Sequence, residues 1–195
     1  MIYAPELTLR EARGVYFRRS NFGEDGGYGE RWIKVKVWRI PIWLPNTAGR
    51  VKAVKLHDLH HVLTEYPTTW SGEAEISSWE VGSGGLRRYY AGWVLDLMNV
   101  AQGLVVNPRG VYHAFMRGRR SSNLFATEFS DELLENRVGD FRHRLNLDQA
   151  STADPTFFDQ AAFLFWIMLS AMTYVVALGV PLLPLLLIVL WILWL

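Results

Sequence analysis

Residues 57–73 read HDLHHVLTEYPTTWSGE, and they join a run of metal-ligand side chains to the end of one helix and the start of another. If residues 46–65 form a helix, the turn of about 100° per residue places His57, Asp58 and His61 on an arc of roughly 100°. Leu56, Leu59, Val62 and Leu63 fall on a separate arc of the same helix. One face of this helix would therefore pack in the core, and the adjoining face would carry ligands.

Glu73 completes the pattern from a second segment. Pro67 ends the first helix, because the residue before a proline is pushed out of the α region, and a second helix is expected to begin at Trp70 or Ser71.

Two imidazoles four residues apart on a helix can hold a divalent metal, and the carboxylates of Asp58 and Glu73 would add oxygen ligands. This set suits zinc, with iron or manganese as alternatives. The competing interpretation is a solvated polar face; the clustering of three of the chain's five histidines favours a metal.

The motif His57-Asp58-x-x-His61-x(11)-Glu73 resembles the signature of the fourth coenzyme Q (ubiquinone) biosynthesis protein, the Coq-four family. The resemblance extends over residues 46–120 and includes the glycine just before the glutamate. It implies a mainly helical, membrane-associated protein in which these four residues bind the metal. It also implies that the protein handles long-chain polyprenyl lipids, replaces a ring carboxyl by hydroxyl during quinone synthesis, and holds other quinone enzymes together.

Composition narrows the classes of protein that need to be considered. Half of the 195 residues are apolar, which is ample for a core, and the net charge of +1 implies no bulk attraction to nucleic acid. The absence of cysteine excludes disulfides, thiolate zinc sites and cysteine nucleophiles. An HD-type phosphohydrolase is ranked low, because only His113 and His143 remain as further histidine ligands.

The rest of the chain up to residue 150 reads as helices with one small β-hairpin. Helices are expected over residues 6–20, 70–81, 86–106 and 107–120, with one or two short helices within 130–147 and strands over 31–38 and 39–44. The hairpin is expected to pack on the helices as a flap, with a substrate cover as the alternative. The helix 86–106 contains Asp96, Asn99 and Gln102, which argue against a membrane span. A core helix is favoured there over an interfacial helix or the wall of a lipid tunnel.

The C-terminal part changes composition completely. No charged side chain occurs from Ala161 to Leu195, which predicts transmembrane structure. Gly179, Pro181 and Pro184 interrupt the run, so a transmembrane helical hairpin of about 161–178 and 184–195 is expected, with a single span followed by an interfacial helix as the alternative. Residues 151–160 are expected to be a linker.

Basic residues upstream of the apolar run bear on orientation. Arg117-Gly118-Arg119-Arg120 could bind anionic head groups beside a membrane. By the positive-inside rule, the basic residues of 117–144 place the N-terminal domain on the cytoplasmic side. An integral membrane protein of this orientation is therefore expected.

The fold class expected from the sequence is mainly α: a helical metal-binding domain over residues 1–150, built around a helix–loop–helix, with a β-hairpin and a C-terminal membrane hairpin. The expected function, taken together with the resemblance, is a membrane-anchored metalloprotein that processes a prenylated aromatic by oxidative decarboxylation. Asp58 and Glu73 are the candidate catalytic residues, and Glu73 is expected to move because it arrives on a separate helix. The alternative is a non-catalytic scaffold with a structural zinc, which presents lipid or recruits other lipid-biosynthesis enzymes. An oligomer is compatible with either function.

Overall fold

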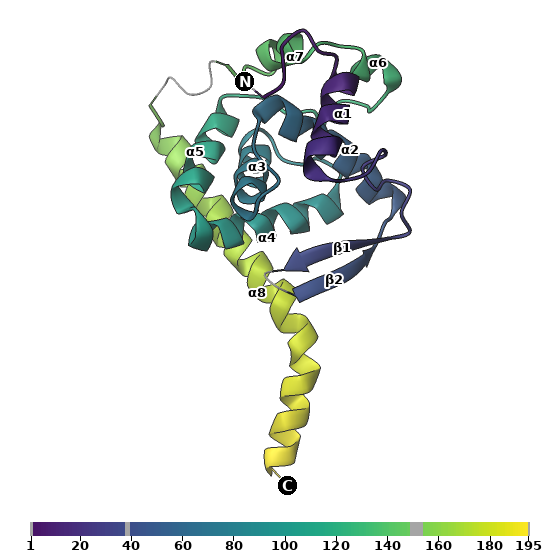
Figure 1. The fold of residues 1–195 in the computed structure, drawn as a ribbon. Coiled ribbons are helices and arrows are strands. Elements are labelled where there is room, and N and C mark those ends of the chain that lie inside the picture. The colour runs from purple at the N-terminus through teal and green to yellow at the C-terminus, as the bar shows by residue number, and fades with distance from the viewer. Residues whose placement is uncertain (1, 38–39, 149–153, 195) are drawn as a thin grey trace.

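The computed structural model describes residues 2–37, 40–148 and 154–194, and it confirms a mainly helical protein (Figure 1). The elements in chain order are α1 (Leu9–Ser20), β1 (Trp32–Val37), β2 (Ile40–Pro45), α2 (Ala48–Thr64), α3 (Trp70–Gly82), α4 (Tyr90–Val106), α5 (Pro108–Arg119), α6 (Asp131–Leu134), α7 (Val138–Arg144) and α8 (Phe157–Trp194).

The helix–loop–helix of α2 and α3 has clear local causes. Thr47 caps α2 by accepting from the Arg50 amide, and Thr69 caps α3 by accepting from the Gly72 amide. Glu65 ends α2 in the left-handed conformation. Gly72 lies so close to the preceding loop that a Cβ there would meet the Pro67 carbonyl oxygen at 1.9 Å. The turn between the two helices is therefore tight, and it fixes how the first turn of α3 faces α2.

The main core lies between α1, α2, α3 and the segment that carries α6 and α7. Its largest fully buried side chain is Trp79 of α3, whose indole nitrogen donates to Ser121 Oγ at 2.9 Å. Fully buried leucines of α1 and α2 surround it, at positions 9, 56, 59 and 63. The leucine arc expected on α2 is therefore in the core, and the burial of this layer holds the ligand-bearing face in place.

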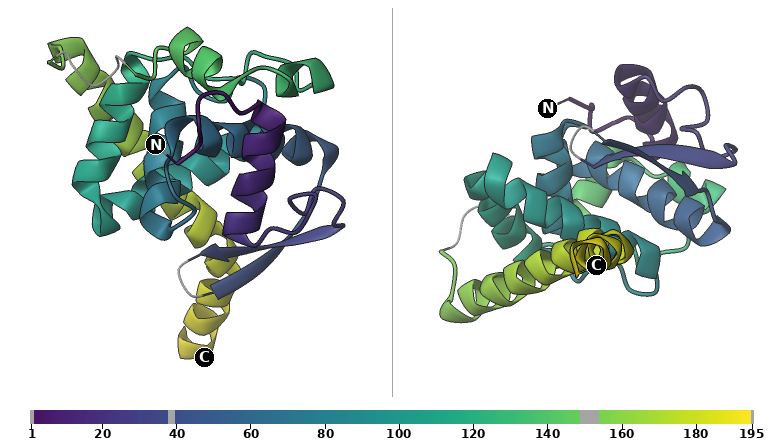
Figure 2. Two further views of the ribbon diagram at one scale, coloured as in Figure 1. Left: turned by 45° about the horizontal axis from the view of Figure 1, so that its top comes forward. Right: turned by 90° about the horizontal axis from the view of Figure 1, so that it is seen from below.

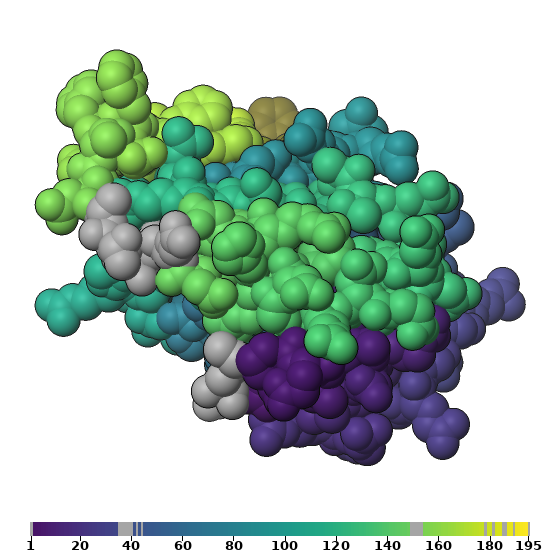
Figure 3. Space-filling view, turned by 90° about the horizontal axis from the view of Figure 1, so that it is seen from above, coloured from purple at the N-terminus to yellow at the C-terminus, as the bar shows by residue number. Residues whose placement is uncertain are grey.

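The strands β1 and β2 pair antiparallel, with Lys34 opposite Trp43, so the small β-hairpin expected from the sequence is present. Figures 1 and 2 show it at the same end of the domain as α4. Figure 3 shows the opposite face, covered by the N-terminal segment and by the residues from about 120 to 148.

The C-terminal helix differs from the predicted hairpin. α8 is one continuous helix of 38 residues, about 57 Å long, and the expected break between 178 and 184 is absent. A proline inside a helix removes one hydrogen bond and crowds the preceding turn, and apolar helices tolerate this. Gly179, Pro181 and Pro184 therefore do not end α8. Residues 151–153 of the predicted linker 151–160 lie outside the described residues, and α8 begins within the rest of it, at Phe157.

The first half of α8 packs on the helical domain and the second half projects away from it (Figures 1 and 2). Trp166 stacks on Trp93 of α4 at 5.2 Å between ring centroids, and Phe163 lies 5.3 Å from the Phe115 ring of α5. Asp159 pairs with Arg119 at 3.0 Å near the start of α8. Within the described residues, α8 provides the one helix long and apolar enough to cross a membrane, and its candidate span is Phe157–Ala177.

Candidate metal centre

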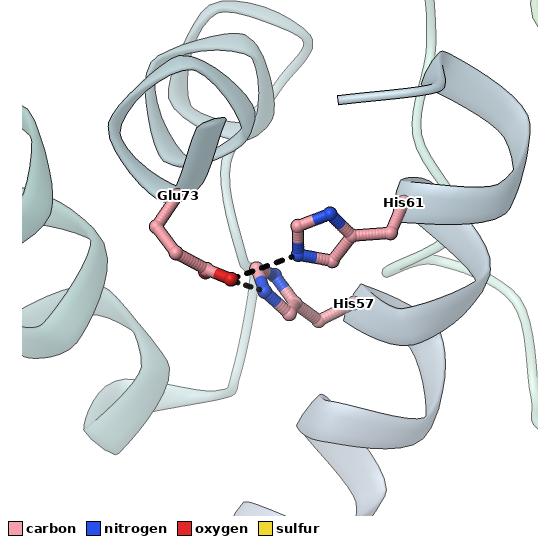
Figure 4. Close-up of side chains that lie close together, drawn as sticks. All are labelled: His57, His61 and Glu73. Atoms are coloured by element: carbon pink, nitrogen blue, oxygen red, sulfur yellow. Dashed lines mark ion pairs between the residues drawn. The ribbon is translucent and has the colours of Figure 1, made fainter. Parts of the chain in front are cut away.

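Three of the four predicted ligands meet where α2 faces the first turn of α3 (Figure 4). His57 Nε2 lies 3.5 Å from one carboxylate oxygen of Glu73, and His61 Nε2 lies 3.4 Å from the other. The ligand atoms of these residues all lie within 4.8 Å of one another, so the group can hold a metal ion. The helical spacing brings the two imidazoles together, and the tight turn before Glu73 brings the carboxylate to them.

The spacing of these atoms suits a metal better than it suits hydrogen bonds. Four ligands at about 2.1 Å from a tetrahedral zinc ion are about 3.4 Å apart, whereas an N–H···O bond is about 2.9 Å long. Moreover, His61 Nε2 is buried and has no hydrogen-bond partner among the described residues. A buried nitrogen without a partner is costly. A bound cation would remove that cost, so the residues present fit a metal.

The other ring nitrogen of His61 is fixed by the backbone. Its Nδ1 lies 2.8 Å from the Tyr66 carbonyl oxygen, which can only accept, so Nδ1 carries the proton and donates it. The lone pair of the neutral ring is then on Nε2, which faces Glu73. Such an outer hydrogen bond is the usual way in which proteins orient a metal-binding imidazole.

Glu80 plays the corresponding role behind His57. Its carboxylate is fully buried and lies 2.9 Å from His57 Nδ1 and 2.6 Å from His60 Nδ1. His60 Nε2 accepts the Leu124 amide at 2.8 Å, so both nitrogens of His60 are used inside the fold. His60 therefore positions Glu80 and is not a ligand, whereas His57 is left with Nε2 directed at Glu73.

These contacts shift the ionisation of the cluster. Burial alone would lower the pKa of His57, but the carboxylates of Glu80 and Glu73 outweigh burial and raise the pKa well above its ordinary value. Burial alone would raise the pKa of Glu73, but the neighbouring imidazoles of His61 and His57 outweigh burial and lower the pKa. The metal-free cluster is thus an ion pair, in which a proton on His57 occupies the place that a metal would take.

Asp58, the fourth predicted ligand, is not among the grouped atoms. Its carboxylate is buried; Tyr16 donates to Oδ1 at 3.2 Å and Tyr28 donates to Oδ2 at 2.5 Å. Burial raises the pKa of Asp58, and the Tyr28 hydrogen bond and the neighbouring histidines oppose the rise. Each oxygen keeps a second lone pair, so the ligand role of Asp58 stays a prediction, with the two phenols as the groups that orient the carboxylate.

Asp96 on α4 forms a second group with His57 and Glu80, whose ligand atoms also lie within 4.8 Å of one another. Its carboxyl is buried, and Ser77 donates to Oδ1 at 3.3 Å. Burial and the neighbouring Glu80 carboxylate raise the pKa of Asp96 well above its ordinary value. Burial and the Glu80 carboxylate therefore favour the protonated form of Asp96 next to the cluster. The sequence showed Asp96 only as a polar interruption of an apolar helix.

A cavity of about 450 Å³ opens beside the cluster. His57, Asp58 and Glu73 form part of its wall, and the rest, which is mostly apolar, comes from α1, α2, α4, β1, the segment 22–30, Leu86 and Phe125. Arg50 also lines it, two turns before His57 on the same face of α2. Arg50 donates to Asn46 at 2.6 Å, while its Nε is buried without a partner among the described residues. The cavity thus combines an apolar wall, a ligand cluster and one guanidinium.

Sequence reasoning missed Glu80 and the special position of His60. A signal was present, because Glu80 follows Glu73 by seven residues, which places both carboxylates on one face of α3. That periodicity could have suggested a carboxylate behind the histidines, but it does not say which histidine Glu80 would reach.

Comparison with protein-family models, with curated proteins and with solved structures gave no match to this chain. The site is therefore interpreted from its own geometry.

Proposed function

We propose that this chain is a membrane-anchored metalloprotein that processes an amphipathic aromatic lipid, of the kind used in quinone or prenyl-lipid biosynthesis. One observation carries the proposal: the ligand atoms of His57, His61 and Glu73 converge, and two of these residues, His57 and Glu73, line a largely apolar cavity. Such a cavity suits an apolar tail, and the cluster suits the polar head that reacts. The narrower assignment to quinone biosynthesis rests in addition on the resemblance of the motif to the Coq-four family.

The residues of the chain would divide the work as follows. His57, His61 and Glu73, with Asp58 beside them, would hold zinc, or alternatively iron or manganese. A bound ion would supply a Lewis acid, and a redox-active ion would also supply the means to use oxygen in an oxidative decarboxylation. Asp96 would keep its proton at the cavity wall.

Arg50 would orient the substrate. Arg50 lines the cavity, and burial lowers the pKa of its guanidinium. An anionic group on the substrate would accept hydrogen bonds from this guanidinium, because guanidinium and carboxylate match in charge and geometry. The guanidinium would then hold the substrate's polar end in the cavity while its tail follows the apolar wall.

Membrane attachment would come from α8. Its exposed apolar side chains and its length fit a span. By the positive-inside rule the domain would lie on the cytoplasmic side, which stays a prediction from its basic residues. The substrate class and the anchor therefore agree, because a long-chain prenyl aromatic resides in the bilayer.

A structural zinc in a lipid-presenting or enzyme-recruiting scaffold is the second candidate. Asp58 is held next to the cluster by two phenols, and a site with four protein ligands leaves no open position for chemistry. The two candidates differ in whether Glu73 must leave the ion.

Glu73→Gln separates them. We expect this variant to keep the fold and much of the metal but to lose turnover, because the amide neither balances charge nor accepts a proton. The test is complementation of a strain deficient in the corresponding lipid pathway, with protein abundance and metal content measured in the same cells and the co-purified lipids identified. Glu75→Gln is the matched control, because Glu75 lies on the same helix and only accepts a hydrogen bond from Asn107.

Loss of complementation with metal and abundance retained would support catalysis at the ion. Full complementation by Glu73→Gln and also by His57→Ala would reject catalysis and favour the scaffold.

A further inference from the structure

Large apolar side chains are exposed at the end of the domain from which α8 projects. Trp32 and Trp43 of the hairpin are 51% and 59% exposed, and Tyr90 and Val94 near the start of α4 are 79% and 45% exposed. Figure 1 shows the hairpin and α4 together at this end. We propose that these residues, the hairpin–α4 edge, rest in the interface of a lipid bilayer and open the cavity toward it. This inference rests on the proposed anchoring of the chain by α8.

The point along α8 at which the helix leaves the domain supports the placement of the hairpin–α4 edge in the bilayer interface. The apolar contacts of α8 with the domain include Phe163, Trp166 and Leu169, and Ser170 is fully buried. The candidate span Phe157–Ala177 includes these contact residues, so the part of α8 that is free to cross a membrane is residues 171–194. This part projects for about 36 Å, enough to cross a hydrocarbon core of about 30 Å. Because Trp166 stacks on Trp93 of α4, the start of α4 lies within about two turns of the point where α8 becomes free. A membrane around the free segment would therefore meet the hairpin–α4 edge.

The chemistry of this edge also fits a membrane surface. Basic side chains accompany the aromatic rings: Lys34 Nζ lies 5.8 Å from the centroid of the exposed Trp43 ring, and the Arg88 guanidinium lies 5.9 Å from that of the half-buried Tyr89. Arg87 is exposed beside Arg88. Tryptophan and tyrosine favour the bilayer interface, and basic side chains there gain about 1 kcal/mol each from anionic lipids. A surface that binds a soluble protein would not require aromatic rings and basic side chains together.

The basic run at 117–120, which the sequence suggested for head-group contact, lies elsewhere. Arg119 pairs with Asp159 in the first turn of α8, eleven residues before Ser170 and therefore about 16 Å away along the helix axis. Arg117 donates to the Thr64 carbonyl at 3.1 Å inside the domain. These arginines hold the fold together at the end of the domain remote from the projecting segment.

The cavity reaches the same edge. Trp32 and Lys34 are exposed and line it, and so do Leu95 and Asn99, which follow Val94 on α4. An amphipathic molecule in the leaflet next to the domain could thus enter between the hairpin and α4 without crossing bulk water. The edge would supply the substrate route to the cluster at His57.

The absence of cysteine makes a direct test practical. Single-cysteine variants of the full chain, Trp43→Cys and Val94→Cys, would carry an environment-sensitive fluorophore in vesicles of phosphatidylcholine and phosphatidylglycerol. Val176→Cys on the projecting part of α8 reports the span, and Glu132→Cys on α6 reports the remote face. Tyr90→Cys replaces Trp43→Cys if the latter fails to accumulate.

We expect the emission at positions 43 and 94 to shift to the blue and to lose intensity when nitroxide-labelled lipids are added, with no change at position 132. Arg87→Gln combined with Arg88→Gln should reduce this response in the anionic vesicles. Aqueous signals at 43 and 94 with a lipid signal at 176 would overturn the edge and leave the anchor intact. An apolar signal that nitroxide lipids do not quench would place a protein partner there and also overturn it. An aqueous signal at 176 would reject the anchor itself.

Discussion

The two ring nitrogens of each ligand histidine have separate tasks. Nδ1 of His61 is tied to the Tyr66 carbonyl and Nδ1 of His57 is tied to Glu80, so Nε2 of both rings faces Glu73. The outer bonds set the direction of the inner nitrogens before any ion arrives. Preorganisation of this kind raises metal affinity, because little side-chain freedom remains to be lost.

A proton must leave when a metal enters. Glu80 and Glu73 outweigh burial and raise the pKa of His57 well above its ordinary value, which favours the charged form in the metal-free protein. Its favourable contribution to the metal-free fold is fully present below the ordinary histidine value of about 6.5 and is lost as pH rises through the raised pKa. We expect metal binding to release about one proton at pH 7 and to strengthen as pH rises. Titration calorimetry in buffers of different ionisation enthalpy measures this, and an identical heat in every buffer would contradict it.

At the level of single residues, the sequence predicted the ligand cluster but not its support. Helical spacing alone brings His57 near His61, and the turn after Pro67 returns Glu73 to them. Glu80 and Asp96 come from contacts between helices, and no local spacing determines which buried carboxyl meets which imidazole. The same limit applies to His60, which the pattern alone does not distinguish from a ligand.

At the scale of elements, the tight turn between α2 and α3 determines where the carboxylate lies. The proline at 67 made the end of α2 and the start of α3 predictable from the sequence, and the structure adds that Thr47 and Thr69 cap the two helices. The first helix begins at Leu9 and not at residue 6, because Thr8 and Glu11 form a capping box. The fourth begins at Tyr90 and not at Leu86, because the chain first passes through left-handed Arg87.

Gly72→Ala tests the tight turn. A methyl group would meet the Pro67 carbonyl, so the start of α3 must shift and carry Glu73 away from the histidines. We expect a loss of about 1–3 kcal/mol in the free energy of unfolding, together with a loss of metal, although Gly72 is no ligand. Chemical denaturation and metal analysis measure both effects.

Gly49→Ala is the control, because a Cβ there meets nothing within 4 Å. It should leave the metal in place and stabilise α2 by about 0.5 kcal/mol. Equal metal content in the two variants would show that the turn does not position the site.

At the scale of the whole molecule, α8 both covers the domain and leaves it. The sequence identified the apolar run but predicted a hairpin at Gly179, Pro181 and Pro184. The contacts of Phe163 and Trp166 with α4 and α5 could not be predicted, because they depend on the tertiary arrangement of the domain. They explain why the first half of an apolar helix can lie against protein while only the second half is free.

A chain that ends at Ser170 separates these two halves. It keeps the contacts with α4 and α5 but lacks the projecting segment, so we expect alkaline carbonate to extract it from membranes that retain the full chain. High salt should also release part of it, because the remaining contact would be peripheral. Retention of the shortened chain in both treatments would contradict α8 as the main anchor.

The most direct measurement for the central claim is the metal content of the full chain, purified in detergent and analysed by mass spectrometry. We expect about one zinc, iron or manganese ion per chain, lost in His61→Ala and retained in His113→Ala, which removes an exposed histidine of α5. A metal-free wild-type chain that takes up no added ion, or full metal in the double variant His57→Ala and His61→Ala, would contradict the site.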